Sequence, residues 1–343
     1  MKIIFPPAPS NPAPAPPPRR PGSVRRTSTM LMFWPLGFGT PLQLQGRARD
    51  LLTPRNTGAT PVVTAEATLT ARVSLDRTIE AIEVTPDRAG IAGLVGSRGG
   101  GGFRKEVDRV LPGERESGSA LYLLLDDIAG STLISVFAWS RSGMDWTERT
   151  RVFGMEPEEI ERHRLGMENI CSGFRTGSSV FHPDAPNSHN VAAVPPLGDV
   201  TDPWSWHDAG DHPAVAMRRA RRIDVWGADD ELVVDAMFRD SCWTPDGTEV
   251  AVHEYRLDAT VDRSTMILTS VAAEQRVLPY PECNGAAANA AWMVGAHAGD
   301  LRTEVLARLR SIDCCTHLND ALRSLAELPA LVAVLDEDAA GGS

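Results

Sequence analysis

The sequence predicts an α+β fold of two related halves, each an antiparallel sheet covered by helices. Apolar and β-branched residues alternate with a period of two in short segments such as Thr68–Val73 and Leu257–Val261, which is typical of strands. Apolar residues follow helical spacing in Leu301–Arg310 and Thr316–Leu328, and Pro329 is expected to end the second helix. Short sequence segments also recur in the same order along the chain.

This recurrence predicts a tandem duplication. It starts at Arg25-Arg26 and again at Arg221-Arg222. The segments that follow correspond in pairs: Pro41–Asp50 with Leu232–Asp240, Glu66–Val73 with Glu254–Val261, Thr78–Val84 with Thr265–Val271, Leu94–Gly96 with Met293–Gly295, and Phe103–Val107 with Leu301–Val305. Because chance matches would not keep one order, we expect residues 23–150 to form the first repeat and residues 218–332 the second.

Three segments lie outside the repeats. Residues 1–22 are rich in proline, which favours an extended chain with little to bury, so they are expected to be a disordered tail. Residues 333–343 are acidic and small, and they are also expected to be disordered. The insertion, residues 151–217, begins with a polar helix around Pro157–Arg164 and is then irregular. A long irregular stretch in a compact protein is usually functional or disordered, and we expect site loops here.

The composition argues against several classes of protein. The net charge of -11 and the pI near 5.2 are unlike those of a nucleic-acid-binding protein or of a polybasic membrane patch. No segment approaches the roughly 20 apolar residues that span a bilayer. An odd number of cysteines, five, suits reduced thiols and a cytoplasmic location. Lys2 and Lys105 are the only lysines among 34 basic residues, which is typical of a high-GC bacterial genome.

The strongest candidate for chemistry is a Cys/His cluster in the second repeat. Cys315 and His317 open a predicted helix, and Cys283 precedes the helix before it. Three such ligands can hold zinc or iron and leave a coordination position open. Alternatively, Cys315 is a thiolate stabilised by the helix N-terminus, or these are core residues. The first repeat aligns Tyr122–Asp127 here and has no cysteine, so thiol chemistry would belong to the second repeat.

The insertion offers a candidate anion site. Arg175 and Ser178 lie in a run of glycines and hydroxyl residues that can form a backbone nest, with the arginine as a forked partner. The alternative is a plain structured loop. No glycine-rich nucleotide motif is present, so no nucleotide cofactor is expected.

The insertion also offers a candidate general base. Trp204 and Trp206 can line an apolar pocket beside His207, which Asp208 can orient. The alternative is that the tryptophans only pin the insertion onto the sheet.

The second repeat resembles a bacterial family known as domain of unknown function 2889, whose name implies no particular activity. The resemblance covers roughly residues 219–330 and rests on Arg221–Trp226, Asp258–Val261, Leu278–Cys283 and Cys315–Leu318. A weaker likeness, to NifU-type iron–sulfur scaffold proteins, rests on the order of Cys283, Met293–Gly295 and Cys315. The middle cysteine of those scaffolds is missing here, so this likeness implies the fold and not cluster assembly.

These patterns together predict an enzyme that acts on a small, largely apolar organic molecule. Hydrolytic or lyase chemistry is expected, carried by a thiolate or by a metal bound to cysteine and histidine. The alternative is a non-catalytic metal or iron–sulfur carrier. The expected partner is a small-molecule ligand rather than nucleic acid or a membrane, and a homodimer is compatible with the sequence.

Overall fold

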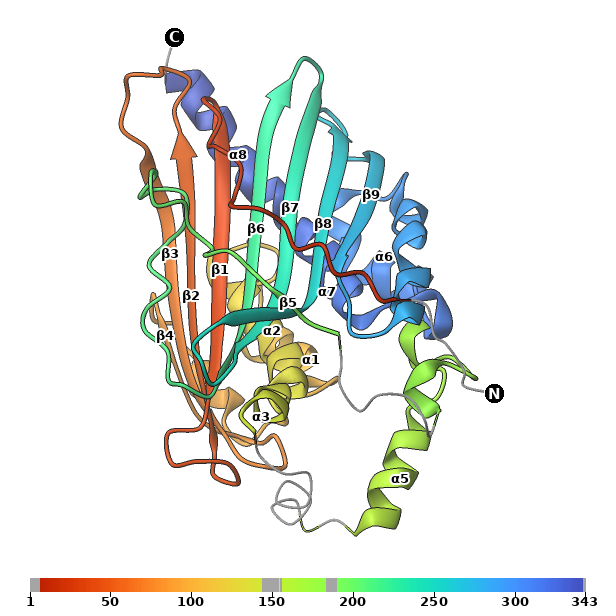
Figure 1. Ribbon diagram of the computed structural model, residues 1–343. Helices are drawn as coiled ribbons and strands as arrows, with labels where there is room; N and C mark the ends of the chain where they lie inside the picture. Colours follow the sequence, from red (N-terminus) through yellow and green to blue (C-terminus); the bar gives the residue numbers. More distant parts are fainter. Residues whose placement is uncertain (1–6, 144–153, 155, 183–189, 342–343) are drawn as a thin grey trace.

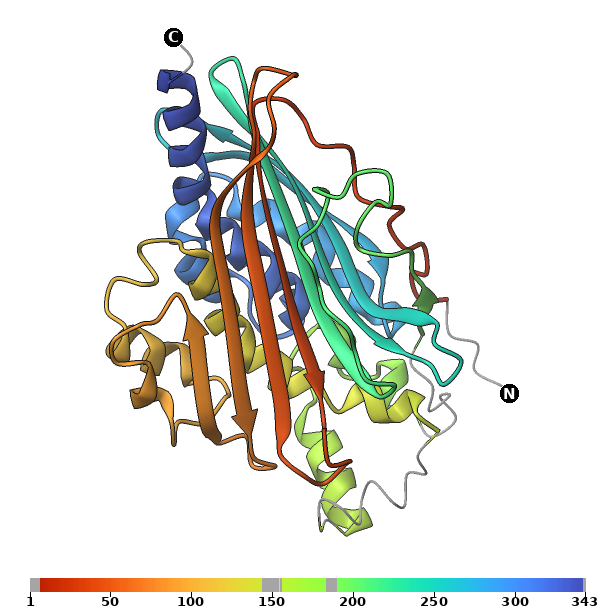
Figure 2. The ribbon, with the colours of Figure 1, turned by 90° about the vertical axis from the view of Figure 1, so that its left-hand side faces the viewer.

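The computed structural model describes residues 7–143, 154, 156–182 and 190–341. Within these ranges the chain forms one antiparallel sheet with helices on one of its faces, which we call the helix face (Figures 1 and 2). The strands are β1 (Ser23–Phe33), β2 (Leu42–Thr53), β3 (Val62–Val73), β4 (Ile79–Thr85), β5 (Ala192–Ala193), β6 (Ala216–Ala228), β7 (Glu231–Trp243), β8 (Glu249–Asp262) and β9 (Leu268–Val277). The predicted α+β class is confirmed.

The helices lie between and after the strands. The α-helices are α1 (Phe103–Val110), α2 (Ala120–Ile134), α3 (Phe137–Arg141), α5 (Pro157–Gly166), α6 (Leu301–Arg308), α7 (Thr316–Ser324) and α8 (Leu328–Gly341). The 3₁₀ helices are η1 (Ile91–Leu94), η2 (Ser172–Phe174), η3 (Ser179–Phe181), η4 (Pro281–Met293), η5 (Ala298–Asp300), η6 (Ser311–Asp313) and η7 (Leu325–Glu327). No helix in the described ranges has the length and apolar character needed to cross a membrane.

The first strands of the two halves are neighbours at the centre of the sheet. The strand order is β4-β3-β2-β1-β6-β7-β8, with β9 and the short β5 both paired to β8. Strand β1 pairs with β6 from Ser23↔Trp226 to Phe33↔Ala216. The chain on either side of this seam therefore contributes to one continuous sheet rather than to two separate ones.

The two halves have the same order of four long strands and share two register shifts, while a further shift at Glu254/Tyr255 of β8 has no counterpart in β3. The register of β2 and β3 shifts between Asp50 and Leu51, and that of β7 and β8 shifts between Asp240 and Ser241. A second pair of shifts follows the same correspondence, at Arg72/Val73 of β3 and Thr260/Val261 of β8. The register thus gives structural partners in the two halves, with Asp50 corresponding to Asp240.

Residues 7–22 are not a detached tail, contrary to the prediction. They cross the face of the sheet that lacks the helices, which we call the outer face (Figure 1). The backbone N–H of Asn11 donates to the carbonyl of Arg276 at 2.8 Å, and Arg25 donates to the carbonyl of Pro17 at 2.8 Å. Proline lacks an N–H but keeps its carbonyl, so a proline-rich segment can still be held by donors on the sheet. The predicted tail residues 1–6 lie outside the described ranges.

The C-terminal end is helical rather than disordered as far as residue 341. Pro329 does not end a helix but lies in the first turn of α8, where its missing N–H costs nothing. Leu331, Val332 and Leu335 are buried, and α8 packs along β1 and β6. The apolar residues of α8 therefore close the helix face over the central seam.

The insertion is divided between two parts of the molecule. Its first part, with η2 and η3, packs on η4, where Glu282 accepts hydrogen bonds from the N–H and the hydroxyl of Ser179 at 2.9 and 2.8 Å. Its second part lies on the outer face, where Trp206 packs against Ala220 of β6. The insertion is thus ordered in both places, although not against the second half alone.

Candidate functional site

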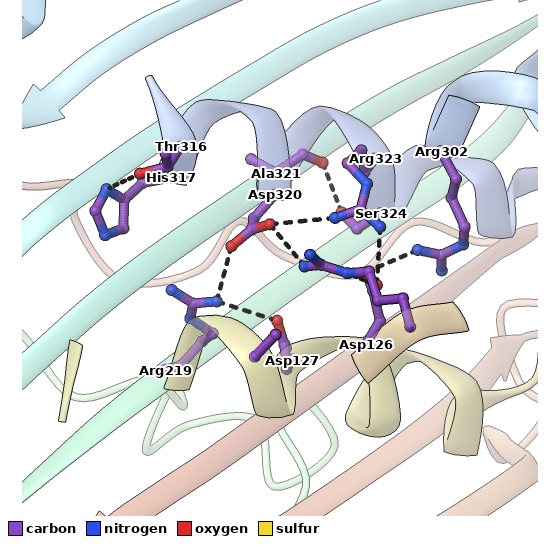
Figure 3. A network of polar contacts seen from close by, with 12 residues as sticks. Asp126, Asp127, Arg219, Arg302, Thr316, His317, Asp320, Ala321, Arg323 and Ser324 are labelled. Atoms are coloured by element: carbon purple, nitrogen blue, oxygen red, sulfur yellow. Dashed lines mark hydrogen bonds and ion pairs between the residues drawn. The ribbon is translucent and has the colours of Figure 1, made fainter. Parts of the chain in front are cut away.

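A network of buried ion pairs holds the helices on the centre of the sheet (Figure 3). Arg219 of β6 binds both carboxylate oxygens of Asp240 at 2.9 and 3.0 Å, and it also contacts Asp320 of α7 and Asp127 of α2. Burial alone would raise the pKa of Asp320, but nearby arginines, Arg104 foremost, lower it to about 2. Asp240 is completely buried, so the network holds its carboxylate at one position on the helix face.

Asp240 faces two histidines at the edge of this network. Asp240 and His253 are cross-strand neighbours on β7 and β8, and His317 lies in the first turn of α7. Each residue offers one donor atom, and these three atoms lie within 4.8 Å of one another. The Nε2 atom of His317 is 3.6 Å from Oδ2 of Asp240, and the two imidazole rings are stacked with centroids 3.4 Å apart. We call these three residues the donor triad.

The donor triad has the chemical character of a metal site. Burial lowers the pKa of His317 to about 3, so its imidazole is neutral near pH 7 and keeps a lone pair on one ring nitrogen. Each oxygen of Asp240 accepts one hydrogen bond from Arg219 and has a further lone pair. Two imidazoles and one carboxylate are ligands that Zn²⁺ and Fe²⁺ take in proteins.

The predicted ligand set of Cys283, Cys315 and His317 is only partly brought together. The Sγ atom of Cys315 is 4.0 Å from Nδ1 of His317, but neither cysteine joins a three-donor group within 4.8 Å in the described ranges. A Cβ atom added to Gly173 would lie 2.4 Å from Sγ of Cys283, so η2 packs directly on that thiol. Burial raises the pKa of both thiols, which opposes the predicted thiolate at Cys315.

The predicted general base is instead a hydrogen-bonded bridge to β1. His207 is buried, with Nδ1 2.8 Å from Oγ1 of Thr27 and Nε2 2.8 Å from Oγ1 of Thr29. Burial lowers its pKa to about 3. The side chain of Asp208 is 86% exposed and binds Arg47 at 3.1 Å, so it does not orient the imidazole. With both ring nitrogens occupied, His207 pins the insertion to the outer face.

The four predicted substrate-binding residues do not meet. Arg175 is exposed, and Ser178 is buried in the loop that packs on η4. Trp206 is buried on the outer face, and Trp204 is half-buried there, with its carbonyl accepting a hydrogen bond from Arg49. The tryptophans therefore secure the insertion rather than face the donor triad.

Sequence reasoning missed Asp240 and His253 as site residues. A usable signal was present, because the match of Glu66–Val73 with Glu254–Val261, extended by one residue, places His253 opposite Ala65. The register agrees, since Asp50 pairs with Ala65 while Asp240 pairs with His253. A histidine opposite Asp240, where the first half has an alanine opposite Asp50, is the signal that could have found this residue.

Comparison with known proteins gives one match. No curated protein and no solved structure matches the chain, so the likeness to NifU-type scaffolds finds no support there. The resemblance of the C-terminal part to an uncharacterised family is confirmed, and the matched region contains all three residues of the donor triad. Residues 217–330 match the model of the family described as protein of unknown function (DUF2889).

Proposed function

We propose that the donor triad binds zinc or iron and that the protein uses this metal in hydrolytic or lyase chemistry on a small organic molecule. Asp240, His253 and His317 supply three ligands, the number that leaves positions open for water and substrate at catalytic sites. Such a metal would supply Lewis acidity and a water molecule of lowered pKa. The protein itself holds Asp240 in place through Arg219 and excludes bulk water from this carboxylate.

The single observation that carries this proposal is the convergence of three donors, of which Asp240 and His253 are buried, in one half only. In the first half the corresponding aspartate, Asp50, binds Arg26 at 2.6 Å and pairs with Ala65. An arginine–aspartate pair therefore meets the needs of the fold without any histidine. The two histidines beside Asp240 are an addition that the architecture does not require, which supports a function.

We also infer that the halves arose by tandem duplication, with the first half as a scaffold. The matched register shifts support this inference, as does a matched connection after the fourth strand. There the N–H of Gly96 donates to the carbonyl of Ile79, and the N–H of Gly295 donates to the carbonyl of Leu268. A duplicated fold frees one copy to change its side chains, because the other copy preserves the sheet and the helix contacts.

A non-catalytic metal carrier is the second candidate. The observation in its favour is burial, since Asp240 is fully buried and the side chain of His317 is 14% exposed. A carrier would bind metal as tightly as an enzyme but would release it to a chelator or acceptor and show no turnover. Turnover of a panel of simple esters, amides and hydroxy acids by metal-loaded protein, lost on stripping, would favour the enzyme.

The metal site is tested by binding. Purified protein stripped with a chelator is titrated with Zn²⁺ in competition with a chromophoric chelator, and metal content is measured by elemental analysis. We expect about one metal per chain, and a loss of 100-fold or more in affinity for His253→Ala and His317→Ala. His297→Ala is the matched control, because its side chain is 43% exposed and outside the triad. Equal affinity in all four proteins, or no binding by the wild type, would refute the site.

A further inference from the structure

The contacts of His317 assign a role to Cys315 that is neither ligand nor nucleophile. We infer that Cys315, supported by Tyr255, is a positioning residue that holds the proton of His317 on Nδ1, so that the Nε2 lone pair faces Asp240 and His253. This inference rests on the proposed metal site and names the contact that would orient one of its ligands. Histidine ligands commonly donate their second ring N–H to an outer partner, which fixes the tautomer and the ring orientation.

The two nitrogens of His317 face different surroundings. Nδ1 lies 4.0 Å from Sγ of Cys315, the residue just before α7, while Nε2 lies 3.6 Å from Oδ2 of Asp240. Only one nitrogen of a neutral imidazole carries a proton. If Nδ1–H donates to the sulfur, Nε2 is bare and points into the triad, as a metal ligand must. Oγ1 of Thr316, 3.4 Å from Nδ1, can accept from the same proton.

Tyr255 lies beside this sulfur. Its side chain is completely buried, and its hydroxyl forms no hydrogen bond among the described residues. The thiol of Cys315 lies near this hydroxyl and is a group toward which its O–H can turn. The backbone N–H groups of His317 and Leu318 also face this sulfur. A sulfur that faces these donors can accept a hydrogen bond from Nδ1–H on a lone pair, while the thiol keeps its own proton.

With the proton on Nδ1, the Nε2 lone pair of His317 joins a ring nitrogen of His253 and an oxygen of Asp240, the three donor atoms that lie within 4.8 Å of one another. A divalent cation would satisfy all three donors at once. The thiol therefore prepares the site without touching the metal.

The tautomer can be read directly in the wild-type protein. In zinc-free protein labelled with ¹⁵N-histidine, long-range ¹H–¹⁵N spectra distinguish the Nδ1–H tautomer from the Nε2–H tautomer. We expect Nδ1–H for His317 in the wild type and a mixture in Cys315→Ala. An Nε2–H tautomer in the wild type would overturn the inference without any variant that has to fold.

Metal affinity gives the second measurement. Loss of an outer partner of a metal ligand typically costs 10–100-fold in affinity, and we expect this loss for Cys315→Ala. Cys315→Ser keeps an acceptor and should retain most of the affinity, and Tyr255→Phe should show a smaller loss with its volume preserved. Cys314→Ser is the control, because that thiol faces the carbonyl of Ile170 at 3.8 Å instead of the ring.

The outcomes separate this inference from the proposed function. If the wild type binds no Zn²⁺, the proposed function fails, while the tautomer of His317 still decides the role of Cys315. If the wild type binds Zn²⁺ and Cys315→Ala keeps both its affinity and its tautomer, the inference fails and the metal site stands. An equal loss of affinity in Cys314→Ser would show general loosening of α7, and it too would overturn the inference.

Discussion

Replacing Gly130 by alanine should destabilise the protein, although the same change stabilises most helices. Gly130 lies inside α2, and a Cβ atom built there would be 2.0 Å from Nη1 of Arg219 and 2.9 Å from Oδ2 of Asp320. Both neighbours belong to the buried ion network, and the side chain of Arg219 is 1% exposed. The guanidinium has no solvent to move into, so the methyl group must displace an ion pair.

The magnitude follows from two opposing effects. Alanine in a helix interior is favoured over glycine by about 1 kcal/mol. Breaking a buried ion pair so that one charge loses its partner costs about 3–5 kcal/mol. We therefore expect Gly130→Ala to lower the free energy of unfolding by about 2–4 kcal/mol. The metal affinity should fall as well, because Arg219 holds both oxygens of Asp240.

Urea denaturation followed by circular dichroism measures the loss of stability. The urea concentrations at the unfolding midpoints are compared, provided that the slope of the unfolding free energy against urea concentration is the same for both proteins. Gly166→Ala is the matched control, since Gly166 is also helical and a Cβ atom there meets nothing within 4 Å. The control should be neutral or slightly stabilising. If Gly130→Ala proves as stable as the wild type, α2 does not pack against Arg219 as closely as the structure shows.

Three further changes test other parts of the structure. Gly173→Ala should lower the free energy of unfolding by about 1–3 kcal/mol, because the added methyl group would overlap Cys283. Adding Cys283→Ala should recover part of that loss in a double-mutant cycle. Additive losses would contradict direct contact between the two residues. His207 has a folded pKa of about 3, below its unfolded value near 6.5, so the unfolded chain gains its proton first as the pH falls. The contribution of His207 to stability is present above about pH 6.5 and is lost progressively as the pH falls to about 3. His207→Gln should therefore flatten the pH dependence of the unfolding midpoint between these values. An unchanged pH profile would refute the assignment. Deletion of residues 1–21 should lower the free energy of unfolding by about 1–3 kcal/mol, because each hydrogen bond made by Pro9, Asn11 and Pro17 contributes about 1 kcal/mol net. An unchanged unfolding midpoint in the truncated protein would instead support the prediction that this segment is a disordered tail.

The sequence alone determined those elements whose signal is local. Alternation in Thr68–Val73 and Leu257–Val261 predicted parts of β3 and β8, and helical spacing in Leu301–Arg310 predicted α6. Such patterns reflect which side chains face the core, and they can be read from residues that are close together in the sequence. The same locality led to errors. Pro329 can end one helix or begin the next, and a proline-rich segment is a tail only if no donors lie beside it.

The donor triad could be decided only by the tertiary structure. Asp240 and His253 meet because the register of β7 and β8 sets them opposite each other, and His317 meets them because α7 is held on that sheet by the ion pairs of Asp320. A slip of one residue in the register would turn His253 to the outer face, since successive side chains of a strand point to opposite sides. Cys315 lies outside the triad for a related reason, because its sulfur is 4.0 Å from Nδ1 of His317 and does not join the three donor atoms.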